Sequence, residues 1–391
     1  MLNEETLKKN KEGDNEFMMK AEEKCEVIPF FDYPHLFNTN AKDYISIIQN
    51  VGHRGAFIMQ KDLCDFEANL AAYTGAKYAV GVANATDGLQ MGLMAGGIEG
   101  GDEVIFCSHT MVATASAIYF AGAKPIPVEA GPDHLIDPEA IEAAVTPRTK
   151  AIIPTQLNGR TANMDAIKTI SKKHNLLIFE DAAQALGSKY KEKCAGTFGV
   201  ASCISFYPAK ILGCLGDGGA VLTSNEDVYK KLLLLRDHGR DENGDVVLWG
   251  FNSRLDNLQA AILDFQFKDY QKVIVRRREI ANIYQDCLGN LEQLVLPSAP
   301  DRDPDHYDVF QNYEIEAENR DKLKASLSEK GVGTLIQWGG KAVHQYHKLG
   351  FNQTLPFTER LFKRILMLPM NMSLPDDDVH YVCECIIEFY R

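Results

Sequence analysis

The chain has 391 residues, of which 45% are hydrophobic and 24% are charged, and its net charge is −13. This balance is typical of a folded globular enzyme and excludes a disordered or low-complexity protein, while the length predicts a large domain with a smaller second one. The negative charge repels phosphate backbones, which argues against a nucleic-acid partner, and no apolar run is long enough to span a membrane.

Residues 1–26 are charged and have almost no periodic apolar positions, so we expect a polar extension that is either a flexible arm or a weak leading helix. The same residues lack the apolar core of a signal peptide, which predicts a cytoplasmic protein. The nine cysteines are scattered and include no Cys-x-x-Cys pair. Free thiols are therefore expected, and neither a disulfide framework nor a metal site is indicated.

From Val27 onward, short apolar runs alternate with segments of helical spacing. This alternation predicts buried strands of a mostly parallel sheet, and hence an α/β fold. The predicted strands are residues 78–82, 103–107, 124–128, 151–155, 176–180, 203–207 and 219–223. Helices are predicted at 113–121 and 164–174, and Thr86 with Asp87 resembles a capped helix start.

The pattern of charged and apolar residues changes after about Phe265. A long charged helix at 272–288 is followed by the strand-like segment YEIEA and a final amphipathic helix. These features predict a large domain over 27–265 and a smaller C-terminal α+β domain over 266–391. In sheets of the predicted kind, functional side chains collect at the carboxyl ends of the strands.

Two charged residues follow predicted strands. Asp181 comes directly after the run 176–180, and Lys210 lies on a turn among glycines and small residues. A carboxylate at the end of a buried strand usually has a cationic partner, because an unpaired buried charge is costly. A lysine in a crowded apolar loop can act as a Schiff-base nucleophile, because desolvation lowers its pKa towards the free amine. Together the two residues suggest a cofactor with a cationic ring nitrogen and an aldehyde, which pyridoxal phosphate offers.

On this interpretation Asp181 keeps the ring nitrogen protonated, and Lys210 binds the aldehyde and then moves a proton as general base and acid. The phosphate needs an anion site, which the segment after strand 78–82 can form from small residues and a helix start. Ala85 and Thr86 are the expected backbone donors, and the Ser205 hydroxyl is a further one. Taken singly, the lysine is more often a surface residue, the Thr-Asp pair is more often only a helix cap, and the aspartate is as often a structural ion pair. It is the joint occurrence of these residues, in this order, that favours the cofactor.

Four segments of the sequence, EDAAQA, GTFG, SFYPAKILGCLGDGGAV and GFNSRLDNLQAAIL, resemble the DegT/DnrJ/EryC1/StrS family of sugar aminotransferases. The resemblance runs from about Ile28 to the C-terminus and is strongest between Gly75 and Phe265. It implies the fold-type I architecture of pyridoxal-phosphate-dependent transferases and a homodimer with shared active sites. It also implies that an amino group moves from L-glutamate to a keto-sugar linked to a nucleotide diphosphate, as in deoxyamino-sugar and polysaccharide biosynthesis.

The resemblance also implies residue roles by motif position. Lys210 is then the Schiff-base lysine, Asp181 the partner of the ring nitrogen, and Gln184 the contact of the ring hydroxyl oxygen. The remaining implied contacts go to the phosphate, from Ala85, Thr86, Ser205 and, in the neighbouring subunit, Asn252.

The chain departs from the family pattern at two places. Met111 stands where the family typically has an aromatic ring that stacks on the cofactor, although a thioether can also pack against a ring face. The segment 333–350 is less typical as well, so Trp338, Lys341 and His344 are candidates for sugar or nucleotide recognition.

Several alternatives remain open. Relatives with histidine in place of Lys210 catalyse dehydration, so the lysine favours transamination. The segment NSRLD, which contains Ser253, resembles the form found in enzymes that aminate C3 of the sugar. Relatives that aminate C4 of a 4-keto-6-deoxy sugar more often have a tyrosine at this position. A dinucleotide-dependent oxidoreductase needs a Gly-x-Gly-x-x-Gly turn after a strand, which the sequence lacks. A catalytically inactive binding or regulatory relative would be expected to have lost Lys210 or Asp181, and both are present.

Overall fold

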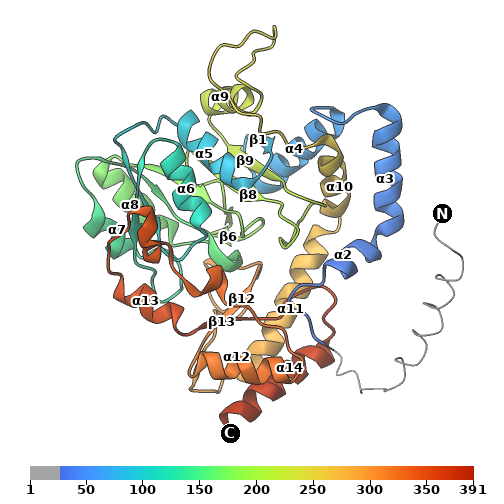
Figure 1. Cartoon of the computed structure of the whole chain (residues 1–391), viewed down its shortest axis with the longest axis vertical. Coiled ribbons are helices and arrows are strands. Elements are labelled where there is room, and N and C mark those ends of the chain that lie inside the picture. Colours follow the sequence, from blue (N-terminus) through green and yellow to red (C-terminus); the bar gives the residue numbers. More distant parts are fainter. Residues whose placement is uncertain (1–26) are drawn as a thin grey trace, which may run out of the picture.

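The computed structural model describes residues 27–391, so the expectation for residues 1–26 lies outside the described residues. Within them, seven strands form one sheet in the order β1-β9-β8-β5-β4-β2-β3 (Figure 1). Neighbouring strands from β8 to β3 run parallel, whereas β9 is antiparallel to both β1 and β8. This mainly parallel sheet confirms the predicted α/β fold class.

The strands of the large sheet coincide closely with the predicted apolar runs. Their bounds are β1 (Tyr78–Val82), β2 (Glu103–Cys107), β3 (Lys124–Val128), β4 (Thr149–Ile153), β5 (Leu177–Asp181), β8 (Ala201–Ser205) and β9 (Gly219–Thr223). The predictions at 151–155, 176–180 and 203–207 were shifted by one or two residues, and the other four have the predicted bounds. Asp181 is therefore the last residue of β5 rather than the residue after it.

Helices cover both faces of this sheet, because successive strand residues point to opposite sides. Val104 and Phe106 of β2 pack in the core beneath one group of helices, and Ile105 packs beneath the other. The first group is α5 (Ala85–Ala95), α6 (Val112–Phe120) and α9 (Glu226–Arg236). The second group is α4 (Lys61–Thr74), α7 (Pro138–Ala144), α8 (Met164–His174) and α10 (Asn257–Phe267).

The start of α5 differs from the prediction in its capping residue. The helix begins at Ala85, and Asn84 is its N-cap rather than Thr86 or Asp87. The Asn84 side chain accepts a hydrogen bond from the backbone N–H of Asp87 at 2.9 Å, which is the usual role of an N-cap oxygen. The first N–H groups of the helix therefore lie directly behind the end of β1.

A second, smaller core lies around three antiparallel strands of the C-terminal part, β10 (Leu294–Val295), β12 (Tyr313–Ala317) and β13 (Ile365–Leu368). Helices α12 (Arg320–Glu329) and α14 (Asp376–Tyr390) pack against it. The long helix α11 (Tyr270–Leu288) joins the two cores, since Ile274 packs near the large sheet and Tyr284 in the smaller core (Figure 1). The division at residue 265 stays a prediction.

The N-terminal described segment crosses from the smaller core to the large one. Ile28 pairs with Val332, and Asn371 donates a hydrogen bond to the Pro29 carbonyl at 2.7 Å. The remaining elements are α2 (Tyr33–Thr39), α3 (Ala41–Arg54), α13 (Pro356–Phe362), β6 (Lys189–Tyr190), β7 (Lys193–Cys194), β11 (His306–Tyr307) and four short 3₁₀ turns at Leu157–Gly159, Gln337–Gly340, Val343–Gln345 and His347–Leu349. Across residues 27–391, each helix is too short or too polar to span a bilayer.

Candidate active site

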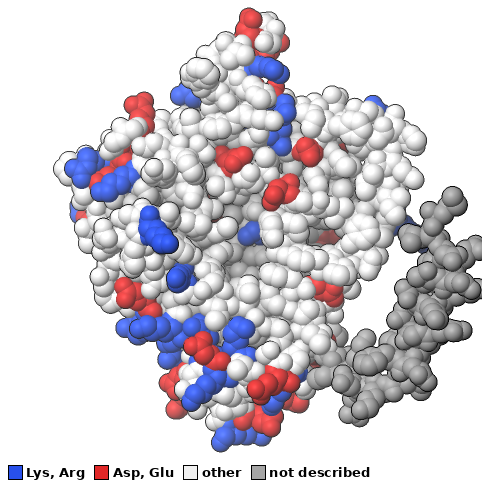
Figure 2. Space-filling view, viewed as in Figure 1, with Lys and Arg blue, Asp and Glu red and all other residues white. Residues whose placement is uncertain are grey.

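A cavity of about 500 Å³ lies where β2, β4, β5 and β8 end and where α5 and α6 begin. Figure 2 shows this face of the molecule hollowed near its centre, with most charged side chains gathered towards the margins. Seven of the predicted site residues line the cavity: Ala85, Thr86, Met111, Asp181, Gln184, Ser205 and Lys210. Residues that are up to 125 positions apart in the chain thus meet at one edge of the sheet, as parallel strands predict.

Asp181 is 7% exposed and has a hydrogen-bond donor on each carboxylate oxygen. The Thr114 hydroxyl donates to Oδ2 at 2.6 Å, and the Ala183 N–H donates to Oδ1 at 3.2 Å. Thr110 and Thr155 extend this contact into a row of hydroxyls, with oxygen separations of 2.9 and 3.0 Å. The sequence reasoning missed all three threonines, although Thr110 and Thr155 stand just beyond the ends of β2 and β4.

Glu180, the neighbour of Asp181, has a different environment. It is fully buried and accepts hydrogen bonds from the Gln156 side chain at 2.8 Å and from three backbone N–H groups. Those groups belong to Gly196, Phe198 and Gly199, at 2.8, 2.6 and 3.2 Å. Burial raises the pKa of Glu180, and these donors oppose that effect. The carboxylate therefore anchors the loop 194–199 and does not face the cavity.

Lys210 lies on the loop after β8, and Gln311 of the C-terminal part holds that loop on both sides. The Gln311 side chain accepts from the Ile211 N–H and donates to the Ala209 carbonyl, both at 2.9 Å. Burial lowers the pKa of the Lys210 amine to about 8, against the opposing attraction of Asp181. Within residues 27–391 its Nζ makes no hydrogen bond, so the amine is positioned yet free to react.

The Gln184 side chain is oriented by its neighbours. Its Oε1 accepts from the Asn158 N–H at 2.8 Å and lies 3.4 Å from the Asn312 side-chain nitrogen. Because the carbonyl oxygen is already engaged, the amide nitrogen is the atom left to donate into the cavity. Asn158 adopts a left-handed backbone conformation, with φ of 55°, that brings its N–H to this position.

The N-terminus of α5 forms the opposite end of the cavity. Ala85 and Thr86 present N–H groups that have no partner within the helix, a natural site for a phosphate. The backbone of Gly219 packs tightly behind them, since a Cβ there would lie 2.6 Å from the Asn84 carbonyl carbon and 2.7 Å from the Ala85 nitrogen. An amine, a carboxylate, an amide donor and an anion site in one cavity fit pyridoxal phosphate.

Some of the other candidates from the sequence line the cavity and others lie away from it. Met111 is 52% exposed and Trp338 also lines the cavity, with a left-handed φ of 54°. His344 is buried beside the Ser108 hydroxyl at 2.7 Å, and neither it nor Lys341 lines the cavity. Asn252 is exposed and also lies outside the cavity lining of its own chain.

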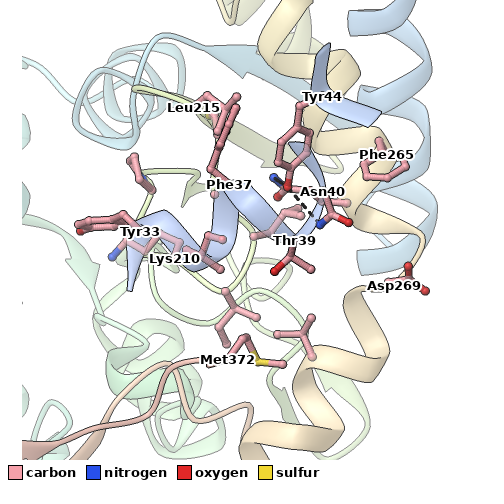
Figure 3. A pocket seen from close by; sticks show the side chains of 18 of the residues that line it. Tyr33, Phe37, Thr39, Asn40, Tyr44, Lys210, Leu215, Phe265, Asp269 and Met372 are labelled. Carbon is pink, nitrogen blue, oxygen red and sulfur yellow. Dashed lines mark hydrogen bonds between the residues drawn. The ribbon is translucent and has the colours of Figure 1, made fainter. Parts of the chain in front are cut away.

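A second cavity, of about 610 Å³, adjoins the Lys210 loop and was not anticipated from the sequence (Figure 3). Its walls are largely aromatic and apolar and come from α2, α3, α10, α11 and the loop itself. Near one wall the Gln266 side chain donates to the Tyr44 hydroxyl at 3.1 Å. Tyr207 and Lys210 line both cavities, so the lysine loop separates them.

Comparison with known proteins shows relatives along nearly the whole described chain. A "Pleiotropic regulatory protein" from Geobacillus stearothermophilus is 38% identical over 93% of this chain and 99% of its own length. The UDP-2-acetamido-2-deoxy-3-oxo-D-glucuronate aminotransferase of Pseudomonas aeruginosa is 36% identical over 87% and 94%. The crystal structure of DesV from S. venezuelae superposes with a TM-score of 0.89 at 35% identity, covering 93% of this chain and 98% of that one.

The model of the DegT/DnrJ/EryC1/StrS aminotransferase family matches residues 38–387. This match covers the large sheet, the cavity and the smaller core, and aminotransferases of this family use pyridoxal phosphate. The chain therefore belongs to the DegT/DnrJ/EryC1/StrS aminotransferase family and is a pyridoxal-phosphate-dependent aminotransferase.

Proposed function

We propose that this aminotransferase moves an amino group from L-glutamate to the C3 keto group of a sugar linked to a nucleotide diphosphate. The observation that carries the proposal is the convergence of Lys210, Asp181 and Gln184 in one cavity that ends at the α5 anion site. The Pseudomonas aeruginosa relative, named for a 3-oxo sugar, supports the position of amination. Amination at C4 of a 4-keto-6-deoxy sugar is the alternative.

Bound pyridoxal phosphate supplies an electron-withdrawing ring that stabilises negative charge at the reacting carbon of the substrate. Lys210 would hold the aldehyde end until the amino donor displaces it. Its freed amine would then act as the base that takes the proton from that carbon and as the acid that delivers it to the aldehyde carbon of the cofactor. A pKa of about 8 leaves a useful fraction of this amine neutral near neutral pH. Asp181 would face the ring nitrogen at the other end and keep it protonated.

The remaining proposed roles concern binding. Gln184 donates its amide N–H to the ring hydroxyl oxygen, and Met111 packs against the ring face. The phosphate is held by the N–H groups and hydroxyls of Ala85, Thr86 and Ser205. Ser253 supports this end from behind: it is fully buried, donates to Asp87 at 2.8 Å and accepts from the Ala83 N–H at 3.2 Å.

We further propose that the protein acts as a homodimer in which Asn252 reaches the phosphate of the neighbouring active site. The segment that leads to it, residues 238–251, projects from the body of the chain (Figure 1) and exposes Val246, Val247 and Trp249, the last at 95%. Exposed apolar side chains of this kind mark a surface that another protein covers. Among the described cavity residues Lys210 is the sole cation, so the diphosphate needs charges from a second copy.

The first test follows the bound cofactor and then the position of the amine. L-glutamate should convert the absorbance of the bound aldehyde form to that of the amino form. In the reverse direction, the protein should form glutamate from 2-oxoglutarate with UDP- or dTDP-linked 3-amino sugars and not with 4-amino isomers. Turnover of the 4-amino sugars alone would overturn the C3 assignment, and a cofactor that ignores glutamate would overturn the donor.

A further inference from the structure

Three buried threonines form a continuous row of hydroxyls that ends on Asp181. Thr155 is 5% exposed, Thr110 is 1% exposed and Thr114 is fully buried. Their oxygens are 3.0 and 2.9 Å apart, and the last lies 2.6 Å from Asp181 Oδ2. The row draws on three separate segments that follow β2, begin α6 and follow β4. It lies along the wall of the cavity, in which all four residues take part.

The charge of Asp181 fixes the direction of every bond in this row. A carboxylate offers only acceptor oxygens, so Thr114 donates to Asp181. With its proton used, Thr114 can only accept from Thr110, and Thr110 in turn accepts from Thr155. Each hydroxyl thus points its positive end towards the carboxylate, and such aligned bonds strengthen one another in a buried site.

We propose that Thr114, aligned by Thr110 and Thr155, is a positioning residue that fixes the Asp181 carboxylate and stabilises its charge opposite the cofactor ring nitrogen. Thr114 occupies Oδ2, and this contact sets the rotation of the carboxylate group. The other oxygen, Oδ1, has the Ala183 N–H at 3.2 Å and the Cys203 thiol at 3.6 Å, a longer and weaker set of contacts. Oδ1 is therefore the oxygen better placed to accept from a protonated ring nitrogen.

Two titratable groups from β8 and the loop that follows it interact with the same carboxylate. The Cys203 thiol has its pKa raised well above the usual range, by burial first and then by the charge of Asp181. It therefore stays neutral, and its contact with Oδ1 is that of a weak donor. The Lys210 amine, when protonated, attracts Asp181. Among the neutral groups that contact Asp181, Thr114 makes the shortest hydrogen bond, so the threonine row stabilises the carboxylate most strongly.

The experiment reads the protonation of the ring nitrogen directly. The full chain is loaded with ¹⁵N-labelled pyridoxal phosphate, and the nitrogen chemical shift and the cofactor dissociation constant are measured without any sugar. Thr114→Val, which keeps the shape of the side chain, should move the shift towards that of the unprotonated ring and weaken cofactor binding about tenfold. Thr114→Ser keeps the hydroxyl and should match the wild type. Thr155→Val should change both quantities in the same direction by a smaller factor.

A matched control separates this role from a general loss of stability. Thr223 is also a buried threonine, and its hydroxyl donates to the Val200 carbonyl at 2.7 Å, far along β9 from the cavity. Thr223→Val should leave the nitrogen shift at the wild-type value. If Thr114→Val and Thr155→Val both leave the shift and the affinity unchanged, the proposal is wrong. If Thr114→Val does not fold, Thr155→Val decides alone. Because no sugar is used, the result is independent of the substrate proposed above.

Discussion

The region around Asp181 and the segment that leads to Asn252 differ in how far their side chains find partners within one chain. Asp181 is buried, and both of its oxygens have donors from the same chain, Thr114 of α6 and Ala183 just after β5. The segment 238–251 instead projects from the body and exposes Trp249 at 95% (Figure 1). The contacts of Asp181 are thus complete within one chain, whereas the apolar side chains of the segment 238–251 stay exposed in the described chain.

This difference suggests a division of labour between the two regions. Chemistry shared by all aminotransferases needs a fixed carboxylate and a fixed lysine, which a rigid sheet edge supplies best. Recognition of the nucleotide end depends on loops, which vary more readily and can come from a second chain. The following experiments test whether the two regions have these separate roles.

Mixed dimers give the largest expected effect. Lys210→Ala alone should reduce turnover by about 10²–10⁴-fold, because the proton-transfer base is lost. Asn252→Ala alone should also lower activity through weaker phosphate binding. When the two variants are mixed, one site in each hybrid dimer regains both side chains if Asn252 acts across the interface.

Recovery of activity on mixing is therefore the expected result, measured as turnover after joint refolding. The double variant Lys210→Ala/Asn252→Ala, mixed with wild type, is the control for simple subunit exchange. No recovery in the first mixture, with hybrid dimers shown to be present, would mean that Asn252 serves its own chain or no site at all.

Two neighbouring carboxylates should separate stability from cofactor binding. Glu180→Ala removes the carboxylate that accepts from four donors in and beside the buried core, so we expect a loss of about 3 kcal/mol or more in the free energy of unfolding. Asp181→Asn keeps an acceptor for Thr114 and should cost about 1 kcal/mol or less, while it weakens cofactor binding by roughly tenfold to a hundredfold. Urea unfolding and cofactor titration measure the two quantities, and equal stability losses would contradict the assigned roles.

A smaller effect concerns pH. Only the neutral amine of Lys210 can capture the cofactor aldehyde, and burial lowers its pKa from 10.5 to about 8. The neutral fraction grows as pH rises, so the capture rate in the cofactor-free protein should increase about tenfold per pH unit below 8 and level off above it. Stopped-flow absorbance measures this rate. A rate that keeps rising towards pH 10.5 would show an ordinary, solvated lysine.

Much of the fold and part of the site could be predicted from the sequence. Apolar runs located the strands within two residues, and strand ends located Asp181 and the turn carrying Lys210. The reversed direction of β9 and the Asn84 cap were missed, because local patterns do not specify strand order or which of several polar residues bonds a helix start. The Thr114 contact with Asp181 spans 67 positions and the Gln311 contact with Ile211 spans 100, so both depend on tertiary packing.

The most direct test of the central claim is to identify the residue that carries the cofactor. The protein loaded with pyridoxal phosphate is reduced with borohydride, which makes the bond to the amine permanent, and is then digested and mapped by mass spectrometry. The structure predicts that the added mass lies on Lys210 and that L-glutamate, added before the reductant, prevents the labelling. Labelling of another lysine, such as Lys341, with Lys210 unmodified would contradict the account.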